Sequence, residues 1–180
     1  MSAPPQNRNE DIRAVEFRAM TTADLPLMAR WLETPHMREW WGDPETELGQ
    51  IRGMIEGRDT TRPFLFLIDG EPAGYIQYWF IGHHQNAEWI AGHPWLAELP
   101  SDTIGVDLSI GDAGDLGRGI GSTVLRRFVE RLTDEGHATI VIDPDPGNGR
   151  AVRAYEKAGF RAMPHLIGRT GDALIMQYQP

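Results

Sequence analysis

Apolar and polar residues follow two periods along the chain, and segments of the two kinds alternate. Period-two runs and short apolar runs predict strands over residues 14–20, 64–68, 74–80, 103–110, 138–142 and 173–178. Stripes with the helical period predict helices over residues 25–32, 46–57, 119–135 and 149–158. Thr21 and Asp24 stand at capping-box spacing before the first helix, and Pro35 is expected to end it. This interleaving of strands and helices favours an α/β or α+β fold.

The middle of the chain is expected to carry a hairpin and then a long loop. Asp69-Gly70 is a strong turn signal, because both central residues of such a turn take positive φ. The turn makes residues 64–68 and 74–80 antiparallel partners. Residues 81–100 contain Gly and Pro at irregular intervals together with two tryptophans, so we expect an irregular, functional loop there.

Length and composition describe an ordinary globular protein. The 180 residues suit one domain, which we place at residues 13–180 after a frayed tail at residues 1–12. No apolar run approaches the roughly 20 residues of a membrane span. No secretory signal is visible and the chain has no cysteine, so we expect a cytoplasmic location. Without cysteine or a helical His pair, we expect no metal.

The net charge of −9 narrows the choice of partner. Duplex nucleic acid is an unsuitable partner, because its binding requires a basic face. An acidic protein attracts cationic small molecules or basic peptides. The alternative is that the acidity only keeps the protein in solution. The net charge alone does not choose between these two interpretations, so we use it only where local residues support a cationic partner.

A glycine-rich loop lies between the strand at 103–110 and the helix at 119–135. Its residues run Asp115-Leu116-Gly117-Arg118-Gly119-Ile120-Gly121. Glycines let an anion approach the unpaired N–H groups at a helix start, and Arg118 adds a charge. The loop lacks the Lys-Ser/Thr of a Walker motif, and it lies too late in the chain for a dinucleotide fingerprint. On its own it predicts a phosphate site or merely a capped turn.

A second motif lies one strand further on, over residues 148–160. With Asn148, Ala151, Tyr155, Gly159 and Phe160 it has the pattern Asn-x-x-Ala…Tyr-x-x-x-Gly-Phe. Together with the glycine loop, this segment resembles the GNAT acetyltransferase superfamily across nearly the whole chain. The family loop has Gln or Arg where this chain has Leu116. The resemblance implies a GNAT fold of the α/β (α+β) class, with a mixed, mostly antiparallel central sheet of about seven strands flanked by helices.

The resemblance also implies acetyl-CoA as donor and assigns residues to it. The expected cofactor-binding residues are Leu108, Ile110, Gly117, Arg118, Gly119, Ile120, Gly121, Ser122, Asn148 and Lys157. Tyr155 matches the general acid that protonates the leaving thiolate, with a core tyrosine as the alternative. Asn148 contacts either a backbone group or the pantetheine arm, or it is simply a helix N-cap. Asp112 and Asp115 precede the loop, where they either weaken phosphate binding or point away from the phosphate.

Asp107 is an acid in the middle of an apolar strand. Ile104, Val106, Leu108 and Ile110 share one face of that strand, and Asp107 shares the other with Gly105 and Ser109. One interpretation is that this second face meets solvent. The other is that Asp107 lies beside the thioester, holds the acceptor ammonium and accepts its proton. Burial would raise its pKa and make it a better base.

Several segments are similar to the aminoglycoside 6'-N-acetyltransferases, which confer antibiotic resistance. They are Arg38–Gly42, Leu67–Gln77, Gly105–Asp107 and Asp143–Asn148. The resemblance implies that acids and aromatic side chains bind the polyamine sugar, at Trp40, Trp41, Tyr78, Glu88, Trp89, Asp107, Asp143 and Asp172. Cations and sugar rings pack well on Trp faces. The alternatives are core packing for the tryptophans and a turn acid for Asp143.

Other functions within and outside the class stay open at this stage. The double tryptophan also occurs in acyltransferases for siderophores and other hydroxylamines, which use longer acyl donors. A protein or peptide N-acetyltransferase is a third acceptor class. A CoA-binding sensor without turnover is the alternative from another class, and the pairing of Tyr155 with Asp107 disfavours it. The sequence leaves monomer and homodimer equally open.

Overall fold

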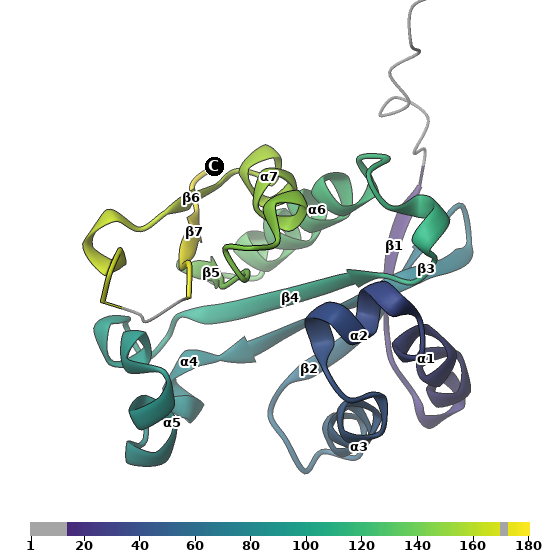
Figure 1. Cartoon of the computed structure of the whole chain (residues 1–180), viewed down its shortest axis with the longest axis horizontal. Helices are drawn as coiled ribbons and strands as arrows, with labels where there is room; N and C mark the ends of the chain where they lie inside the picture. The colour runs from purple at the N-terminus through teal and green to yellow at the C-terminus, as the bar shows by residue number, and fades with distance from the viewer. Residues whose placement is uncertain (1–13, 170–172) are drawn as a thin grey trace, which may run out of the picture.

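The computed structural model describes residues 14–169 and 173–180. Its centre is a seven-stranded sheet with the order β1-β2-β3-β4-β5-β7-β6. The strands are β1 (Val15–Ala19), β2 (Arg62–Ile68), β3 (Glu71–Phe80), β4 (Ile104–Ile110), β5 (Ile140–Ile142), β6 (Phe160–Ala162) and β7 (Met176–Tyr178). Only β4 and β5 pair in parallel, and all other neighbours are antiparallel. The expected mixed, mostly antiparallel sheet is confirmed (Figure 1).

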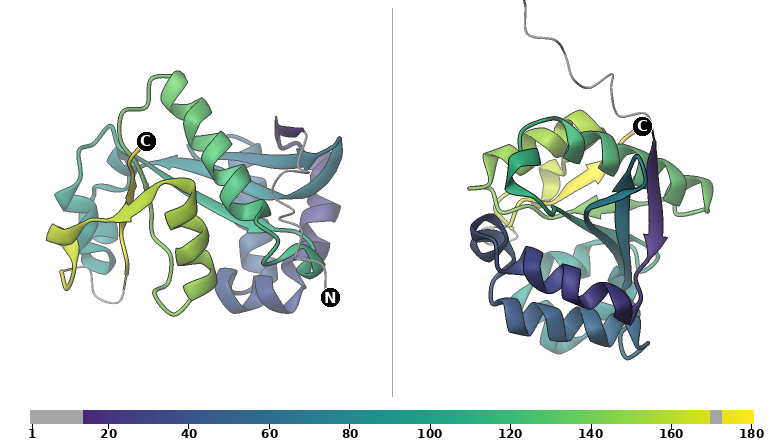
Figure 2. Two further views of the ribbon diagram at one scale, coloured as in Figure 1. Left: turned by 90° about the horizontal axis from the view of Figure 1, so that it is seen from above. Right: turned by 90° about the vertical axis from the view of Figure 1, so that its right-hand side faces the viewer.

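Helices cover both faces of this sheet (Figures 1 and 2). The α-helices are α1 (Leu25–Leu32), α2 (Pro35–Trp41), α3 (Pro44–Ile55), α4 (Ile81–His84), α5 (Ala87–Gly92), α6 (Ile120–Asp134) and α7 (Gly149–Ala158). Short 3-10 turns occupy Thr22–Asp24, Pro94–Glu98, Ala113–Asp115 and Pro164–Leu166. One apolar core lies between the sheet and α6 and α7, and another lies between the sheet and α1 to α3.

Alternation along the strands explains the two cores. Phe66 and Ile76 pack against the α6 side, whereas Leu65 and Tyr75 pack against the α1 to α3 side. The stripe predicted along α6 is buried, and Phe128 at its centre contacts Phe17 and Phe64 from two strands. Because helices cover both faces of the sheet, the central strands place apolar side chains in a core on each side.

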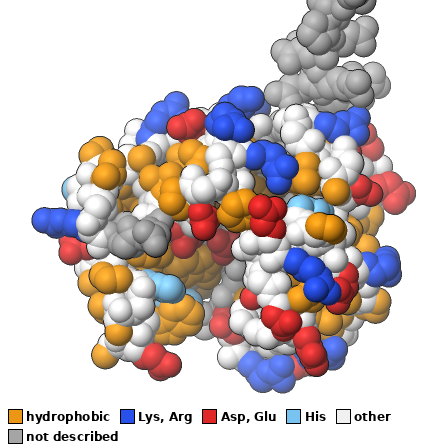
Figure 3. Space-filling view, in the orientation of Figure 1, with side chains coloured by type: hydrophobic (Ala, Val, Ile, Leu, Met, Phe, Trp, Pro, Cys, Tyr) orange, Lys and Arg blue, Asp and Glu red, His pale blue; other side chains and the backbone are white. Residues whose placement is uncertain are grey.

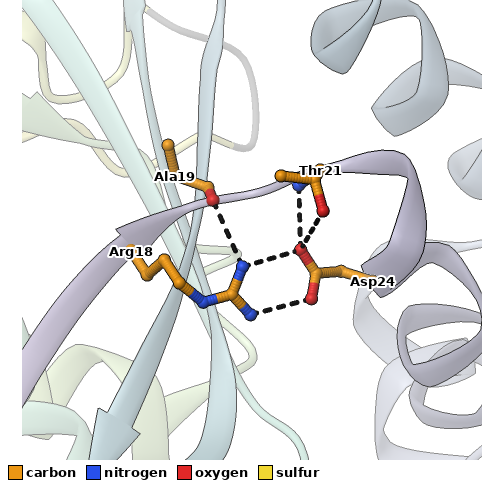
Figure 4. A network of polar contacts seen from close by, with 4 residues as sticks. All are labelled: Arg18, Ala19, Thr21 and Asp24. Atoms are coloured by element: carbon orange, nitrogen blue, oxygen red, sulfur yellow. Dashed lines mark hydrogen bonds and ion pairs between the residues drawn. The ribbon is translucent and has the colours of Figure 1, made fainter.

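The link between β1 and α1 contains the predicted cap and one ion pair beyond it (Figure 4). Asp24 accepts hydrogen bonds from the backbone N–H of Thr21 at 2.8 Å and from its hydroxyl at 3.1 Å. Arg18 of β1 reaches the same carboxylate with two hydrogen bonds, at 2.8 and 3.0 Å. The Arg18 guanidinium lowers the pKa of Asp24, and the Thr21 bonds contribute further. This contact ties the start of α1 to the edge strand.

The hairpin expected at Asp69-Gly70 is present, since both residues have positive φ, 51° and 85°. Two other expectations need correction. Pro35 does not simply end a helix, because it also begins α2 as an N1 residue, where its missing N–H is no loss. Residues 81–100 are not irregular, because α4, α5 and a 3-10 turn fill them. Gln85 braces that segment by donating to the carbonyls of Leu96 and Leu99 at 2.8 and 2.7 Å.

The strands β4 and β5 separate soon after they meet. They pair only at Ile104 with Ile140 and at Gly105 with Val141. The remainder of β4 continues to Ile110 with β3 on its other side but without β5. The chain then turns through Ala113–Asp115 into α6. An opening therefore forms between the second half of β4 and the start of α7.

Within residues 14–169 and 173–180, no helix combines the length and the apolar character needed to cross a membrane.

Candidate active site

Three cavities lie along the opening between β4 and β5. The first, which we call the loop cavity, has a volume of about 570 Å³ and lies beside the glycine loop. The second, the waist, has about 240 Å³ and is walled by Asp107, Tyr155 and the segment after β5. The third, the aromatic cavity, has about 460 Å³ and lies against α5. Tyr155 lines the first two and Asp107 the last two, so the three form one cleft.

The glycine loop shapes one end of this cleft. Gly117 and Gly119 have φ of 75° and 81°, a region that L side chains rarely adopt, and Gly119 is the N-cap of α6. A Cβ at Gly117 or Gly121 would meet nothing within 4 Å, so open space lies in front of the loop. Helix α6 therefore directs its N-terminal N–H groups and positive dipole end at this space. Such an arrangement binds anions.

The predicted donor-site residues divide into two groups by position. Eight of the residues predicted to bind the donor line the loop cavity: Leu108, Ile110, Gly117, Gly119, Gly121, Ser122, Asn148 and Lys157. Arg118 instead forms an ion pair with Asp115 at 2.9 Å, and with Ile120 it lines a separate surface groove next to Trp31. Asp115 is thereby partly neutralised. Arg150 and Arg153, which the sequence analysis did not single out, join Lys157 on the rim of the loop cavity.

Tyr155 lies on the second turn of α7 at the junction of the loop cavity and the waist. Its side chain is 8% exposed. Asn148 is the N-cap of the helix, where its side-chain oxygen accepts from the N–H of Ala151 at 3.1 Å. It also lines the loop cavity, so its contact with the donor stays a prediction. Burial raises the pKa of Tyr155, and the charges of Asp107 and Asp143 raise it further. The phenol therefore stays protonated and can donate.

Asp107 faces the cleft and not the solvent, because α2, α3 and α5 cover its side of the sheet. Its carboxylate accepts a hydrogen bond from Gln77 Nε2 at 2.8 Å. Gln77 in turn accepts one from the Tyr75 hydroxyl. Burial raises the pKa of Asp107, while the hydrogen bonds from Gln77 and Trp79 oppose that rise. A partly desolvated carboxylate of this kind is suited to accept a proton.

Asp143 follows β5 and faces Asp107 across the waist. Burial raises the pKa of Asp143 to about 8, and the Asp107 charge contributes to the rise. Glu47 of α3 also has a raised pKa, because of burial first and then the charges of Asp107 and Asp43. Acidic side chains and hydrophobic ones surround the hollow between the α5 side and the α2–α3 side of the molecule (Figure 3). Asp107 and Asp143 thus share the wall of the waist, and the charge of one opposes ionisation of the other.

The raised pKa of Asp143 predicts that stability falls as pH rises. The folded state holds a proton on Asp143 between the unfolded pKa of about 3.9 and the folded value, so ionisation across this window favours unfolding. We expect a loss on the order of a few kcal/mol in the free energy of unfolding between pH 5 and pH 8. Urea titrations of Asp143→Asn should show a flatter pH dependence. Asp134→Asn, an exposed acid on α6, is the matched control; equal slopes in all three proteins would contradict the assignment.

The aromatic cavity carries tryptophan and histidine faces. Trp89 of α5 is 46% exposed, and its ring meets His84 at 4.8 Å between centroids. Trp79 and Trp95 form its inner wall, in edge contact at 6.2 Å. Trp79 and Gln77 escaped the sequence analysis, although period-two alternation places both on the Asp107 face of the sheet. Trp40, 37% exposed, and Trp41 close the other side of the waist.

Two expected substrate contacts, Tyr78 and Glu88, lie elsewhere. Tyr78 points to the opposite face of the sheet, because it alternates with Gln77 and Trp79, and it packs there against Phe64, Phe80 and Phe128. Glu88 is exposed on α5 and is absent from the walls of these three cavities. Asp172 lies outside the described residues. Among the residues that are described, no cluster of His, Asp and Glu could hold a metal ion.

This combination of a splayed sheet, an anion-binding glycine loop and a proton donor at the junction is that of an acyl-CoA-dependent transferase. The family model described as Acetyltransferase (GNAT) domain matches residues 20–166, and the chain belongs to this family. It is an acyltransferase of the GNAT fold.

Its relatives include enzymes that act on antibiotics. The chain is 32% identical to the aminoglycoside N(6')-acetyltransferase type 1 of Klebsiella pneumoniae, over 91% of this chain and 82% of that protein. A solved structure of AAC(6')-Ib with paromomycin and acetyl-CoA has a TM-score of 0.75 and 30% identity, covering 92% of this chain and 93% of the other. The lysine N-acyltransferase MbtK of Mycobacterium sp. (strain MCS) is 28% identical, over 76% and 55% of the two chains.

Proposed function

We propose that this protein transfers an acetyl group from acetyl-CoA to a primary amine of a cationic small molecule, the 6'-amine of an aminoglycoside. The observation that carries the proposal is that the two ends of the cleft suit ligands of opposite charge. Its loop end is built for an anion, and its other end is acidic and aromatic. Tyr155 and Asp107 lie at the waist between the two.

The loop cavity fits the donor. The pyrophosphate of acetyl-CoA suits the N–H groups at the start of α6, and the cationic rim of Arg150, Arg153 and Lys157 suits its remaining phosphate. The second half of β4 lacks β5, so backbone groups along that edge, such as those of Leu108, can pair with the amide arm of the donor. The Ile110 carbonyl already accepts a hydrogen bond from His36 Nε2 at 2.9 Å. When bound, acetyl-CoA supplies an activated thioester at the waist. Because this donor is a metabolite of the cytoplasm, we place the protein there.

The waist and the aromatic cavity fit a polyamine acceptor. Asp107 supplies negative charge, Asp143 can ionise when an ammonium group binds beside it, and Glu47 acts on Asp107 from outside the cavity walls. Trp89 and Trp40 offer exposed ring faces. Aminoglycosides combine several ammonium groups with flat sugar surfaces. The ammonium groups can bind to the carboxyl groups, and the sugar rings can pack on the tryptophan faces. The similarity to aminoglycoside 6'-N-acetyltransferases over most of both chains supports the same acceptor.

The chemistry then requires two proton movements. Asp107 accepts a proton from the acceptor ammonium, directly or through one water, and leaves a neutral amine. The amine nitrogen attacks the thioester carbon, so a C–N bond forms and the C–S bond breaks. Tyr155 gives its proton to the leaving sulfur and recovers one from solvent or from the new amide nitrogen. The acids of the waist hold the substrate by its other ammonium groups throughout.

A thiol-release assay with acetyl-CoA tests this function. The acceptors are kanamycin-type aminoglycosides, linear polyamines, lysine and hydroxylysine-type metabolites, and peptides. We expect release with aminoglycosides that carry a 6'-amine and none with analogues that carry a 6'-hydroxyl. Binding of acetyl-CoA without release for any acceptor would instead indicate a sensor.

The similarity to the mycobacterial lysine N-acyltransferase provides a second candidate, a siderophore or hydroxylamine N-acyltransferase. A lysine-type acceptor brings a carboxylate, which the Asp107 carboxylate at the waist would repel. Release with lysine-type metabolites and longer acyl-CoA donors, but with none of the aminoglycosides, would favour this candidate over the first.

A further inference from the structure

Two buried residues of β3 form a hydrogen-bond chain that ends on Asp107. The Tyr75 hydroxyl donates to Gln77 Oε1, and Gln77 Nε2 donates to Asp107 Oδ2 at 2.8 Å. Tyr75 is fully buried and Gln77 is 9% exposed. A buried glutamine is uncommon and is normally kept only with its polar atoms paired.

The sheet register brings the three side chains together. Gln77 of β3 stands directly opposite Asp107 of β4, so their side chains leave the same face at neighbouring points. Tyr75 lies two residues before Gln77 and therefore shares this face. Cross-strand neighbours of this kind contact each other without any bend in the backbone.

Tyr75 determines which way the Gln77 amide points. A glutamine side chain can turn over and present either its oxygen or its NH₂ group to a neighbour. The Tyr75 ring is held in place by Trp41, in edge contact at 5.4 Å between centroids and 77° between planes. Burial raises the pKa of Tyr75, so its hydroxyl remains a donor. With that donor facing Oε1, the NH₂ group faces Asp107, which as a carboxylate can only accept.

We propose that Gln77 and Tyr75 are positioning residues for acetyl transfer, which hold the Asp107 carboxylate ionised and aimed into the waist. The inference rests on the proposed role of Asp107 as proton acceptor. Without the amide N–H, burial and neighbouring acids would leave Asp107 protonated over more of the neutral range, and its carboxyl group would be held by the Trp79 hydrogen bond alone. Loss of the Tyr75 hydroxyl would have the same effect in weaker form, by letting the amide turn over.

The electrostatic setting makes this hydrogen bond important. The ionisable groups that line the same cleft come from the segment before β2, from α4, from the turn after α5, from the segment after β5 and from α7. They include Arg58, Asp59, His84, His93, Asp143 and Tyr155. Glu47 of α3 is outside the cavity walls but close enough for its charge and that of Asp107 to interact. Arg58 is engaged by Glu56 at 2.6 Å. The chain of Tyr75 and Gln77 therefore offsets the desolvation of Asp107, and also the repulsion from any neighbouring carboxyl group that ionises.

Gln77→Met and Tyr75→Phe test the proposal, because each removes hydrogen bonding at nearly constant volume. Tyr178→Phe is the matched control, since it removes a hydroxyl from β7, away from the cleft. Carbon-13 titration of the side-chain carboxyl of Asp107, assigned by its loss in Asp107→Asn, reports the ionisation without any acceptor. The pH profile of kcat/KM for a kanamycin-type acceptor reports the reaction, and KM for acetyl-CoA reports the donor site.

We expect the carboxyl titration of Asp107 to move to higher pH in Gln77→Met, and less far in Tyr75→Phe. On the acid side of the profile, kcat/KM for the acceptor should fall about tenfold in Gln77→Met, since a hydrogen bond to a charged group is lost. KM for acetyl-CoA should stay unchanged. An unmoved titration in both variants would overturn the proposal. A moved titration with no acetyl transfer by the wild type would overturn the proposed function and leave the positioning intact.

Discussion

Asp107→Asn is expected to remove nearly all acetyl transfer while leaving acetyl-CoA binding intact. Asparagine keeps the shape of the side chain and still accepts from Gln77, but it cannot take a proton from the acceptor ammonium. General-base contributions amount to about 10²–10⁴ in rate, and this variant also loses a charge that holds the substrate. The expected effect is therefore at the upper end of that range in kcat/KM for the acceptor.

The donor site provides the internal check on this variant. Asp107 lines the waist and the aromatic cavity, while the walls of the loop cavity are formed by other residues. Calorimetric titration should therefore give the same Kd for acetyl-CoA in wild type and variant. Asp134→Asn removes an exposed acid on α6 and controls for the change in net charge. A weakened Kd for acetyl-CoA in Asp107→Asn would show that Asp107 belongs to the donor site instead.

Tyr155→Phe is expected to lower kcat by about a hundredfold, with little change in either KM. Phenylalanine preserves the ring that packs at the start of the waist, so both substrates should still bind. What is lost is the proton for the departing sulfur, an interaction that forms only as the C–S bond breaks. An interaction of that kind reduces kcat and kcat/KM together. Steady-state kinetics with both substrates varied measures the effects on kcat and on each KM separately.

The same tyrosine could instead be a structural core residue, and the experiment separates the two roles. A structural tyrosine would raise KM or lower the thermal midpoint, whereas a proton donor would do neither to the same degree. Tyr178→Phe controls for removal of a hydroxyl from the sheet layer. If kcat in Tyr155→Phe equals that of the wild type, Tyr155 is not the acid and the leaving thiolate departs unprotonated.

The parts of the site that are continuous in sequence could be predicted. The glycine loop and the start of α6 follow from local rules, because positive φ at Gly117 and Gly119 and the N–H groups of a helix start are properties of a few consecutive residues. The motif from Asn148 to Phe160 likewise places Tyr155 on the second turn of a helix. Period-two alternation was enough to put Asp107 on the face opposite Val106 and Leu108.

The parts of the site that depend on contact between distant segments could not be predicted from the sequence. Tyr78 was expected in the acceptor site, but in the structure it is half-buried on the α6 side of the sheet, and Gln77 and Trp79 face the cleft instead. The direction of an alternating strand is settled only when one of its faces meets a particular helix layer. The sequence pattern of residues 81–100 looked irregular because short helices have weak periodicity. In the structure these short helices are stabilised by the hydrogen bonds of Gln85 and by the burial of Trp95.

The sequence by itself thus determined the local parts of the predicted donor site: a glycine-rich loop, the helix start behind it, and a tyrosine at fixed helical spacing. The tertiary structure decided what that site can act on. The register of β3 against β4 pairs Gln77 with Asp107, and the early parting of β4 from β5 opens the cleft. Packing of α2, α3 and α5 over the same face then desolvates Asp107 and Asp143. Proton affinity depends on distance and dielectric, and both exist only once the chain has folded.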